Sequence, residues 1–243
     1  MRCLVRLNES IRRLYFCMVN RPVPLQNRML TGMAAATLLG MPLLAWIIVQ
    51  FTEDIDLMTR WTGPKHIGIQ LAWGIPVGVV AALIAQFIVS RNFMTGVRLR
   101  YERMFRNLRL NWSEIIFISL CAGVGEELLF RGVLQPLLGI VLTSILFVLI
   151  HGYLNPRDWR ISVYGIYMTV VIVGLGIITE EIGIWSAVAA HTVIDIVLLA
   201  DLRKPIAPDE PFNPNVTLSE FESRPMPKEH DPSEESEDVP RTE

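Results

Sequence analysis

The sequence predicts an all-α, multi-pass membrane protein whose transmembrane helices, about six in number, form a bundle. Of its 243 residues 51% are hydrophobic, and the mean hydropathy is +0.40. The apolar residues also come in runs long enough to cross a hydrocarbon layer of about 30 Å as helices. With a formal net charge of only −2, the composition argues against a soluble domain and against a nucleic-acid-binding protein.

Six apolar runs carry the predicted helices. The first two are the clearest, because each has about 20 residues without a charge. The fourth is the shortest and follows Pro136. In chain order the runs are Thr31–Phe51, Gly68–Ser90, Ile115–Val133, Leu137–Ile150, Ile161–Ile178 and Ile184–Leu199.

Basic residues indicate the orientation, since Lys and Arg are retained on the cytoplasmic side of a membrane. They cluster before the first run and after the second, fourth and sixth runs, whereas acidic residues prevail after the first and fifth. Every basic cluster lies on one side if both termini are cytoplasmic. We therefore expect an integral protein of a bacterial inner membrane with both termini in the cytoplasm.

Three regions follow from this pattern. Residues 1–29 are expected to be a basic cytoplasmic segment, residues 30–202 a transmembrane helical domain with its motif core at 115–200, and residues 203–243 a disordered acidic cytoplasmic tail. The loop Arg98–Arg109 alternates Arg with apolar residues, which fits either an amphipathic helix on the inner leaflet or an ordinary cytoplasmic loop.

Ionisable side chains inside the predicted helices mark the candidate site, because such groups usually face a protein interior or a wet cavity. Glu127 and Arg131 are four residues apart, which favours an ion pair on one helix face and leaves Glu126 without a partner on its own helix. Asp195 has the same spacing from His191 and can orient its imidazole. The complete set is Glu126, Glu127, Arg131, His151, His191 and Asp195.

These groups are expected at different depths. At 1.5 Å per helical residue, Glu126 lies about 20 Å and His191 about 12 Å from the cytoplasmic boundary, with His151 near that boundary. A broken or tilted helix is needed to bring them level, and Pro136 offers one place for a break. The glycines around the acidic pair are expected to permit close helix contact. They are Gly123, Gly125 and Gly132.

A carboxylate and two histidines in one cavity suit two kinds of chemistry. They can activate water as a general base and support an oxyanion. Alternatively, Glu126, His151 and His191 can hold zinc, with water as its fourth ligand. The sequence leaves both open.

Three motifs give the chain a family resemblance. EELLFR at 126–131 resembles the EExxxR motif of the CPBP family, the CAAX proteases and bacteriocin-processing proteins. FVLIH at 147–151 resembles its FxxxH motif, and HTVID at 191–195 its HxxxN/D motif. The motifs occur in the family's order on separate predicted helices.

What the resemblance implies is an intramembrane endopeptidase that cleaves near the cytoplasmic face. By that similarity Glu126 and His151 activate the water, His191 and Asp195 form the oxyanion site, and Glu127 and Arg131 fix the geometry, while Phe147 binds substrate. The substrate is expected to be a membrane-anchored protein or peptide, prenylated in some relatives. The resemblance implies a mechanism in which a glutamate activates the water. A zinc-dependent mechanism is the other one that has been named for the family. Asp195 departs from the Asn of the eukaryotic enzymes, which argues for its orienting His191.

Two other functions fit the same residues. A membrane protein without proteolytic activity can bind a peptide in this cavity, as in bacteriocin immunity or sensor regulation. A proton-coupled carrier also uses buried Glu and His, although the chain lacks the internal repeats of many carriers.

Overall fold

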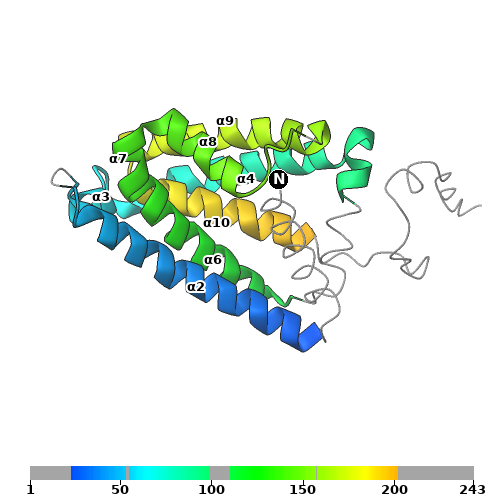
Figure 1. Ribbon diagram of the computed structural model, residues 1–243, viewed down its shortest axis with the longest axis horizontal. Coiled ribbons are helices and arrows are strands. Elements are labelled where there is room, and N and C mark those ends of the chain that lie inside the picture. The colour runs from blue at the N-terminus through cyan, green and yellow to red at the C-terminus, as the bar shows by residue number, and fades with distance from the viewer. Residues whose placement is uncertain (1–22, 53–54, 99–109, 157, 202–243) are drawn as a thin grey trace, which may run out of the picture. The chain divides into compact units, whose positions relative to one another are not determined.

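The computed structural model describes residues 23–52, 55–98, 110–156 and 158–201. Within these ranges every regular element is a helix, so the predicted all-α class is confirmed (Figure 1). The basic N-terminal segment, the alternating loop and the acidic tail fall almost entirely outside the described residues, and the predictions made for them stay predictions.

The helices follow the predicted runs closely, with short extra elements between them. In chain order they are α2 (Val23–Val49), α3 (Leu57–Thr62), α4 (Ile67–Val89), η1 (Asn92–Met94), α6 (Trp112–Leu129), η2 (Phe130–Leu134), α7 (Gln135–Leu138), α8 (Ile140–Ile150), α9 (Trp159–Glu181) and α10 (Ile184–Asp201).

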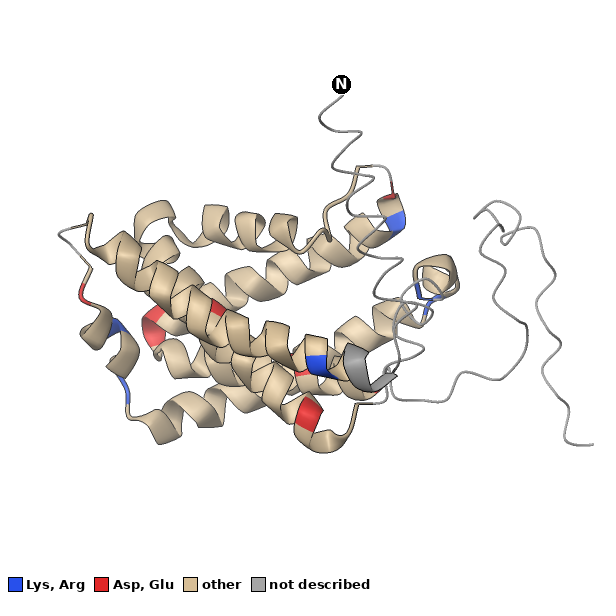
Figure 2. Cartoon of the chain, turned by 60° about the horizontal axis from the view of Figure 1, so that its bottom comes forward, with Lys and Arg blue, Asp and Glu red and all other residues tan. Residues whose placement is uncertain are grey.

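The chain is an integral membrane protein. Four of its described helices, α2, α4, α9 and α10, are long and apolar enough to cross a membrane, by length and composition. The 18-residue α6 is not one of these four and carries three acidic residues, Glu114, Glu126 and Glu127, and α8 is a shorter apolar helix. Most of the helical ribbon is neither acidic nor basic (Figure 2). The membrane bundle is therefore established, and the count of six spans stays a prediction.

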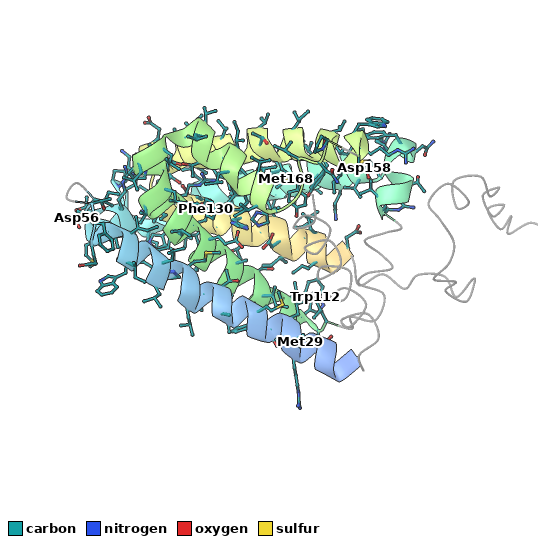
Figure 3. All side chains as sticks on the ribbon, in the orientation of Figure 1. Met29, Asp56, Trp112, Phe130, Asp158 and Met168 are labelled. Atoms are coloured by element: carbon teal, nitrogen blue, oxygen red, sulfur yellow. The ribbon has the colours of Figure 1, made fainter. Side chains whose placement is uncertain are left out.

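The helix ends gather at two ends of the bundle. Figure 3 shows Asp56 at one end, and Met29, Trp112 and Asp158 at the other. At this second end the ring of Phe93 stacks on that of Trp159, with centroids 5.7 Å apart. The loop after α4 and the start of α9 therefore meet there, which agrees with the predicted grouping of the basic loops on one side.

Helix α10 lies at the centre of the packing, against α4, α6 and α9, while α2 packs along α6. Small residues let these helices approach closely. A Cβ atom at Gly123 would collide with the Thr192 hydroxyl of α10, and one at Gly125 would lie 2.7 Å from the Thr37 carbonyl oxygen of α2. At Gly132 an added Cβ would meet no atom nearer than 3.7 Å. The predicted role in close contact is confirmed for Gly123 and Gly125 and wrong for Gly132.

A buried glutamine closes the Asp56 end of the bundle. Gln70, fully buried, donates from Nε2 to the carbonyl oxygens of Thr62 at 2.9 Å and Lys65 at 2.7 Å. Its Oε1 accepts a hydrogen bond of 2.9 Å from the backbone N–H of Trp185. One amide thus joins the start of α4, the end of α3 and the start of α10.

The helix that begins as α6 is irregular near Pro136. Proline has no N–H, and its ring crowds the carbonyl group of the preceding turn, so an α-helix cannot continue undisturbed through it. The five residues Phe130–Leu134 form a π-helix, in which the Gln135 N–H bonds the Phe130 carbonyl oxygen. Wide turns of this kind are frequent at functional sites. The break therefore occurs at the predicted place, just beyond the acidic pair.

Helix α8 is too short to cross a hydrocarbon layer on its own. Its 11 residues span about 16 Å at 1.5 Å per residue, roughly half of a hydrocarbon layer. Figure 1 shows that α8 ends part-way along α9. His151 is the C-terminal cap of this helix, and the depth expected for it relative to the membrane boundary stays a prediction.

Candidate active site

The acidic and basic residues of the first motif form the predicted ion pair. Arg131 Nε donates to Glu127 Oε2 at 2.9 Å, and both side chains are fully buried. A capping box formed by Asn111 and Glu114 fixes where α6 begins, and the helix then directs Glu127 into the bundle. A buried charge is costly without its partner, so each of these two groups requires the other.

His191 joins this pair from α10. Its Nδ1 lies 2.9 Å from Glu127 Oε1 and donates to it, so the two oxygens of one carboxylate bind an arginine and a histidine. Asp195 Oδ2 lies 3.7 Å from His191 Nε2, within ion-pair distance but beyond an ordinary hydrogen bond. Both carboxylates therefore face the imidazole, and Glu127, which the sequence did not connect with it, is the closer.

A second acid–histidine pair lies beside the first. Glu126 Oε2 is 3.4 Å from His151 Nε2, and the two side chains are 13% and 29% exposed. His151 Nδ1 lies 2.7 Å from the carbonyl oxygen of Phe147. Because a carbonyl oxygen only accepts, Nδ1 carries a proton, and in the neutral ring Nε2 then presents its lone pair toward Glu126.

The glutamate and the histidine of this second pair lie within ion-pair distance but beyond an ordinary hydrogen bond. Glu126 Oε2 is a buried atom with no hydrogen-bond partner among the described residues, despite its distance from the ring nitrogen. With His151 neutral both atoms are acceptors, and a single proton donor beside them can hydrogen-bond to both. Glu126 and His151 are therefore placed to bind a small molecule that donates hydrogen bonds.

Phe147 packs the two histidines together. Its ring stacks on His151 with centroids 4.3 Å apart and meets His191 edge-on at 5.8 Å. Phe130, labelled in Figure 3, packs edge-on against its other side at 4.9 Å. With only 3% of its surface exposed, Phe147 holds the imidazole rings in place, and the substrate contact expected of it stays a prediction.

All seven residues singled out from the sequence thus lie in one connected set. The contacts run from Glu126 through the three rings to Glu127 and Arg131, with Asp195 beside His191. They are made by four elements: α6, η2, α8 and α10. The Glu127–His191 contact joins positions 64 residues apart, a separation at which helical periodicity carries no information.

Three further polar residues extend this set, and the sequence analysis missed them. Gln135 Oε1 accepts from Arg131 Nη1 at 3.4 Å, and its Nε2 donates to Glu180 Oε1 at 2.7 Å. Glu180 in turn forms an ion pair with Arg60 of α3 at 2.8 Å. One signal was available for Gln135, because it continues the four-residue spacing of Glu127 and Arg131 along one helix face.

The three proposed zinc ligands do not form a metal site in this arrangement. Among the described residues, no three His, Cys, Asp or Glu side chains are placed to hold a metal ion. His191 in particular uses Nδ1 for Glu127 and turns Nε2 toward Asp195.

Comparison with known proteins identifies a family model and a relative. Residues 108–197 match the family model described as type II CAAX prenyl endopeptidase Rce1-like, a segment that includes all seven residues. The uncharacterized protein YpbD of Bacillus subtilis (strain 168) is 35% identical over 161 residues, which cover 63% of this chain and 79% of that protein. No solved structure matches the chain.

Proposed function

Since the chain belongs to the CPBP family of Rce1-like CAAX endopeptidases, we propose that it is an intramembrane endopeptidase. Its substrate is a membrane-associated protein or peptide, whose peptide bond it hydrolyses near the cytoplasmic face. By the family likeness, prenylated peptides are the first class to try. The bilayer itself is its other partner.

The observation that carries this proposal is the facing pair of Glu126 and His151. Glu126 Oε2 and His151 Nε2 are 3.4 Å apart, so a water molecule beside the pair can donate one hydrogen bond to each of them. Water held by a carboxylate and an imidazole in a partly dry cavity is a good nucleophile, because the carboxylate accepts its proton as the oxygen attacks. Glu126 is then the general base and His151 the group that orients the water.

The remaining steps follow from proton balance. The water oxygen bonds to the substrate carbonyl carbon, Glu126 takes the released proton, and the carbonyl oxygen becomes an oxyanion. As the C–N bond breaks, Glu126 returns that proton to the leaving amine nitrogen. The carboxylate and the water site are thereby restored for another cycle.

His191 supplies the charge that an oxyanion needs. In the imidazolium form both ring nitrogens carry protons, so Nε2 donates while Nδ1 remains bonded to Glu127. Glu127 at 2.9 Å and Asp195 at 3.7 Å provide counter-ions on either side of the ring. Arg131 keeps Glu127 in place and does not itself touch the substrate.

The test uses one isosteric substitution. Protein purified in detergent is incubated with a panel of membrane-anchored peptides, some of them prenylated, and products are identified by mass spectrometry. Wild type should cleave at least one peptide, whereas Glu126→Gln, which has the same shape but cannot take the proton, should cleave none. Glu114→Gln is the matched control on the same helix, because a Gln also completes a capping box and should leave cleavage intact.

Two results would reject the proposal. Full cleavage by Glu126→Gln would show that this carboxylate is not the base. Equal peptide binding by wild type and Glu126→Gln, with cleavage by neither, would favour a binding or regulatory protein that uses the same cavity.

A further inference from the structure

The contacts of the candidate site continue past Arg131 into a buried amide. We propose that Gln135, anchored by Glu180, is a positioning residue for the reaction: it fixes the Arg131 guanidinium, and through it Glu127 and His191. This inference rests on the endopeptidase function proposed above, and it adds residues that lie outside the three motifs.

Arg131 is held from three directions. Its Nε bonds Glu127 of α6, its Nη1 bonds Gln135 of α7 at 3.4 Å, and its Nη2 bonds the Ile172 carbonyl oxygen of α9 at 3.2 Å. A guanidinium is a rigid planar fork, so acceptors on all three nitrogens determine its orientation as well as its position. Loss of one acceptor would leave the group free to tilt about the other two.

The Gln135 amide has only one orientation that satisfies its neighbours. Its Nε2 faces two acceptors of α9, the Gly176 carbonyl oxygen at 3.1 Å and Glu180 Oε1 at 2.7 Å. An amide rotated by half a turn would place its oxygen against both of them, which is repulsive. Glu180 and Gly176 therefore keep Oε1 directed at Arg131.

Glu180 is itself fixed at the Asp56 end of the bundle. Arg60 Nη1 contacts both of its carboxylate oxygens, at 2.8 and 2.9 Å, and this ion pair is partly exposed. A continuous series of hydrogen bonds thus runs from that end to His191. Its members are Arg60, Glu180, Gln135, Arg131, Glu127 and His191.

Helix α9 leaves room for the amide at one position. A Cβ atom at Gly176 would lie 2.8 Å from Gln135 Oε1 and 2.7 Å from a methyl carbon of Ile140. An alanine there would push the amide away from its place. Gly176→Ala therefore disturbs Gln135 without changing any polar group and gives an independent route to the same effect.

Gln70 offers a comparison, because it is the same residue type, equally buried, and bonded to three partners. All its partners are backbone groups at the Asp56 end, and it has no contact with Arg131. Substitution of either glutamine by methionine removes three hydrogen bonds at similar side-chain volume. Only Gln135→Met should alter the site.

The first experiment compares Gln135→Met with Gln70→Met. Both should lower the Tm in detergent, but only Gln135→Met should lower kcat, by about 10-fold or more with little change in KM, because small misplacements of reacting groups reduce the rate steeply. Its ¹⁵N histidine spectrum should show a changed His191 signal and an unchanged His151 signal. Equal kcat in the two variants would overturn the proposal.

A second experiment exchanges the amide and the carboxylate. Gln135→Glu places two carboxylates 2.7 Å apart and should lose activity. Gln135→Glu combined with Glu180→Gln restores a hydrogen bond between the two positions, an acceptor for Arg131 and the original total charge. The double variant should regain at least half of the loss in log kcat that the single substitution Gln135→Glu causes. A double variant with no regained activity would contradict the inference.

The spectrum separates this inference from the function on which it rests. If wild type cleaves no peptide, the proposed function fails, yet the His191 signal still reports whether Gln135 positions the ring. A His191 signal that is the same in wild type and Gln135→Met would reject the positioning role whatever the protein's activity.

Discussion

Glu127 and His191 lie 64 residues apart in the chain and are joined by a hydrogen bond of 2.9 Å inside the bundle. The same carboxylate binds Arg131 through its other oxygen, also at 2.9 Å. One buried glutamate therefore links the first motif with the third. Glu126, its neighbour in sequence, points to a different histidine, so the paired acids serve two separate rings.

Removal of the Glu127 charge should destabilise the protein as well as inactivate it. Glu127→Gln leaves the fully buried Arg131 guanidinium without its counter-ion, and loss of one partner of a buried ion pair costs about 3–5 kcal/mol. We expect a lowered Tm in detergent together with loss of peptide cleavage. An unchanged Tm would show that Arg131 finds another counter-ion.

The matched control removes both charges. Glu127→Gln with Arg131→Met leaves no uncompensated ion, so much of the stability should return while cleavage stays lost, because His191 is still without its carboxylate. Recovery of cleavage in the double variant would show that Glu127 serves only to neutralise Arg131.

The sequence predicted the fold class and the ion pair of Glu127 with Arg131, but not the contacts between helices in the candidate site. A long apolar run predicts a membrane-spanning helix directly. A four-residue spacing predicts a contact between two side chains of one helix, as for Glu127 and Arg131. Contacts between helices carry no such periodic signal, so the bond from Glu127 to His191 was missed. The contact of His151 with Glu126 also joins two separate elements, the end of α8 and α6, and helical spacing did not reveal it either.

The candidate residues chosen from the sequence also left out uncharged polar side chains. Gln135 was missed because it lies between two predicted runs, Ile115–Val133 and Leu137–Ile150, where a polar side chain is expected in a connecting turn. Its importance becomes visible only when α9 brings Gly176 and Glu180 beside it. Glu180 is one of the acidic residues after the fifth apolar run, and its partly exposed side chain accepts a hydrogen bond from Gln135.

Close packing of α6 on α10 should be necessary for the site. Gly123→Ala would force a methyl group against the Thr192 hydroxyl, next to His191, and would place it 3.2 Å from the Val188 carbonyl oxygen. Overpacking of this kind costs about 1–3 kcal/mol, and displacement of α10 should reduce cleavage as well. Thermal unfolding and peptide cleavage in detergent measure both effects.

Gly40 supplies the control for that substitution. It lies in α2, and a Cβ atom there would meet nothing within 4 Å. Gly40→Ala should change stability by no more than about 1 kcal/mol, in the stabilising direction expected for alanine in a helix. Similar losses in the two variants would mean that helix spacing at Gly123 is not what matters.

His151 should be required for turnover but not for folding. It is 29% exposed at the end of α8, and its one described hydrogen bond is to the Phe147 carbonyl oxygen four residues earlier. His151→Ala should therefore leave the Tm within a few degrees of wild type. Without Nε2 beside Glu126 the attacking water loses one of its two acceptors, so kcat should fall by about 100-fold, as expected when a reacting group is misplaced. His66→Ala is the control, because His66 caps the start of α4 through a bond to the Gly68 N–H and has no contact with the site. A His151→Ala variant that turns over as fast as His66→Ala would leave Glu126 to hold the water alone and would remove His151 from the mechanism.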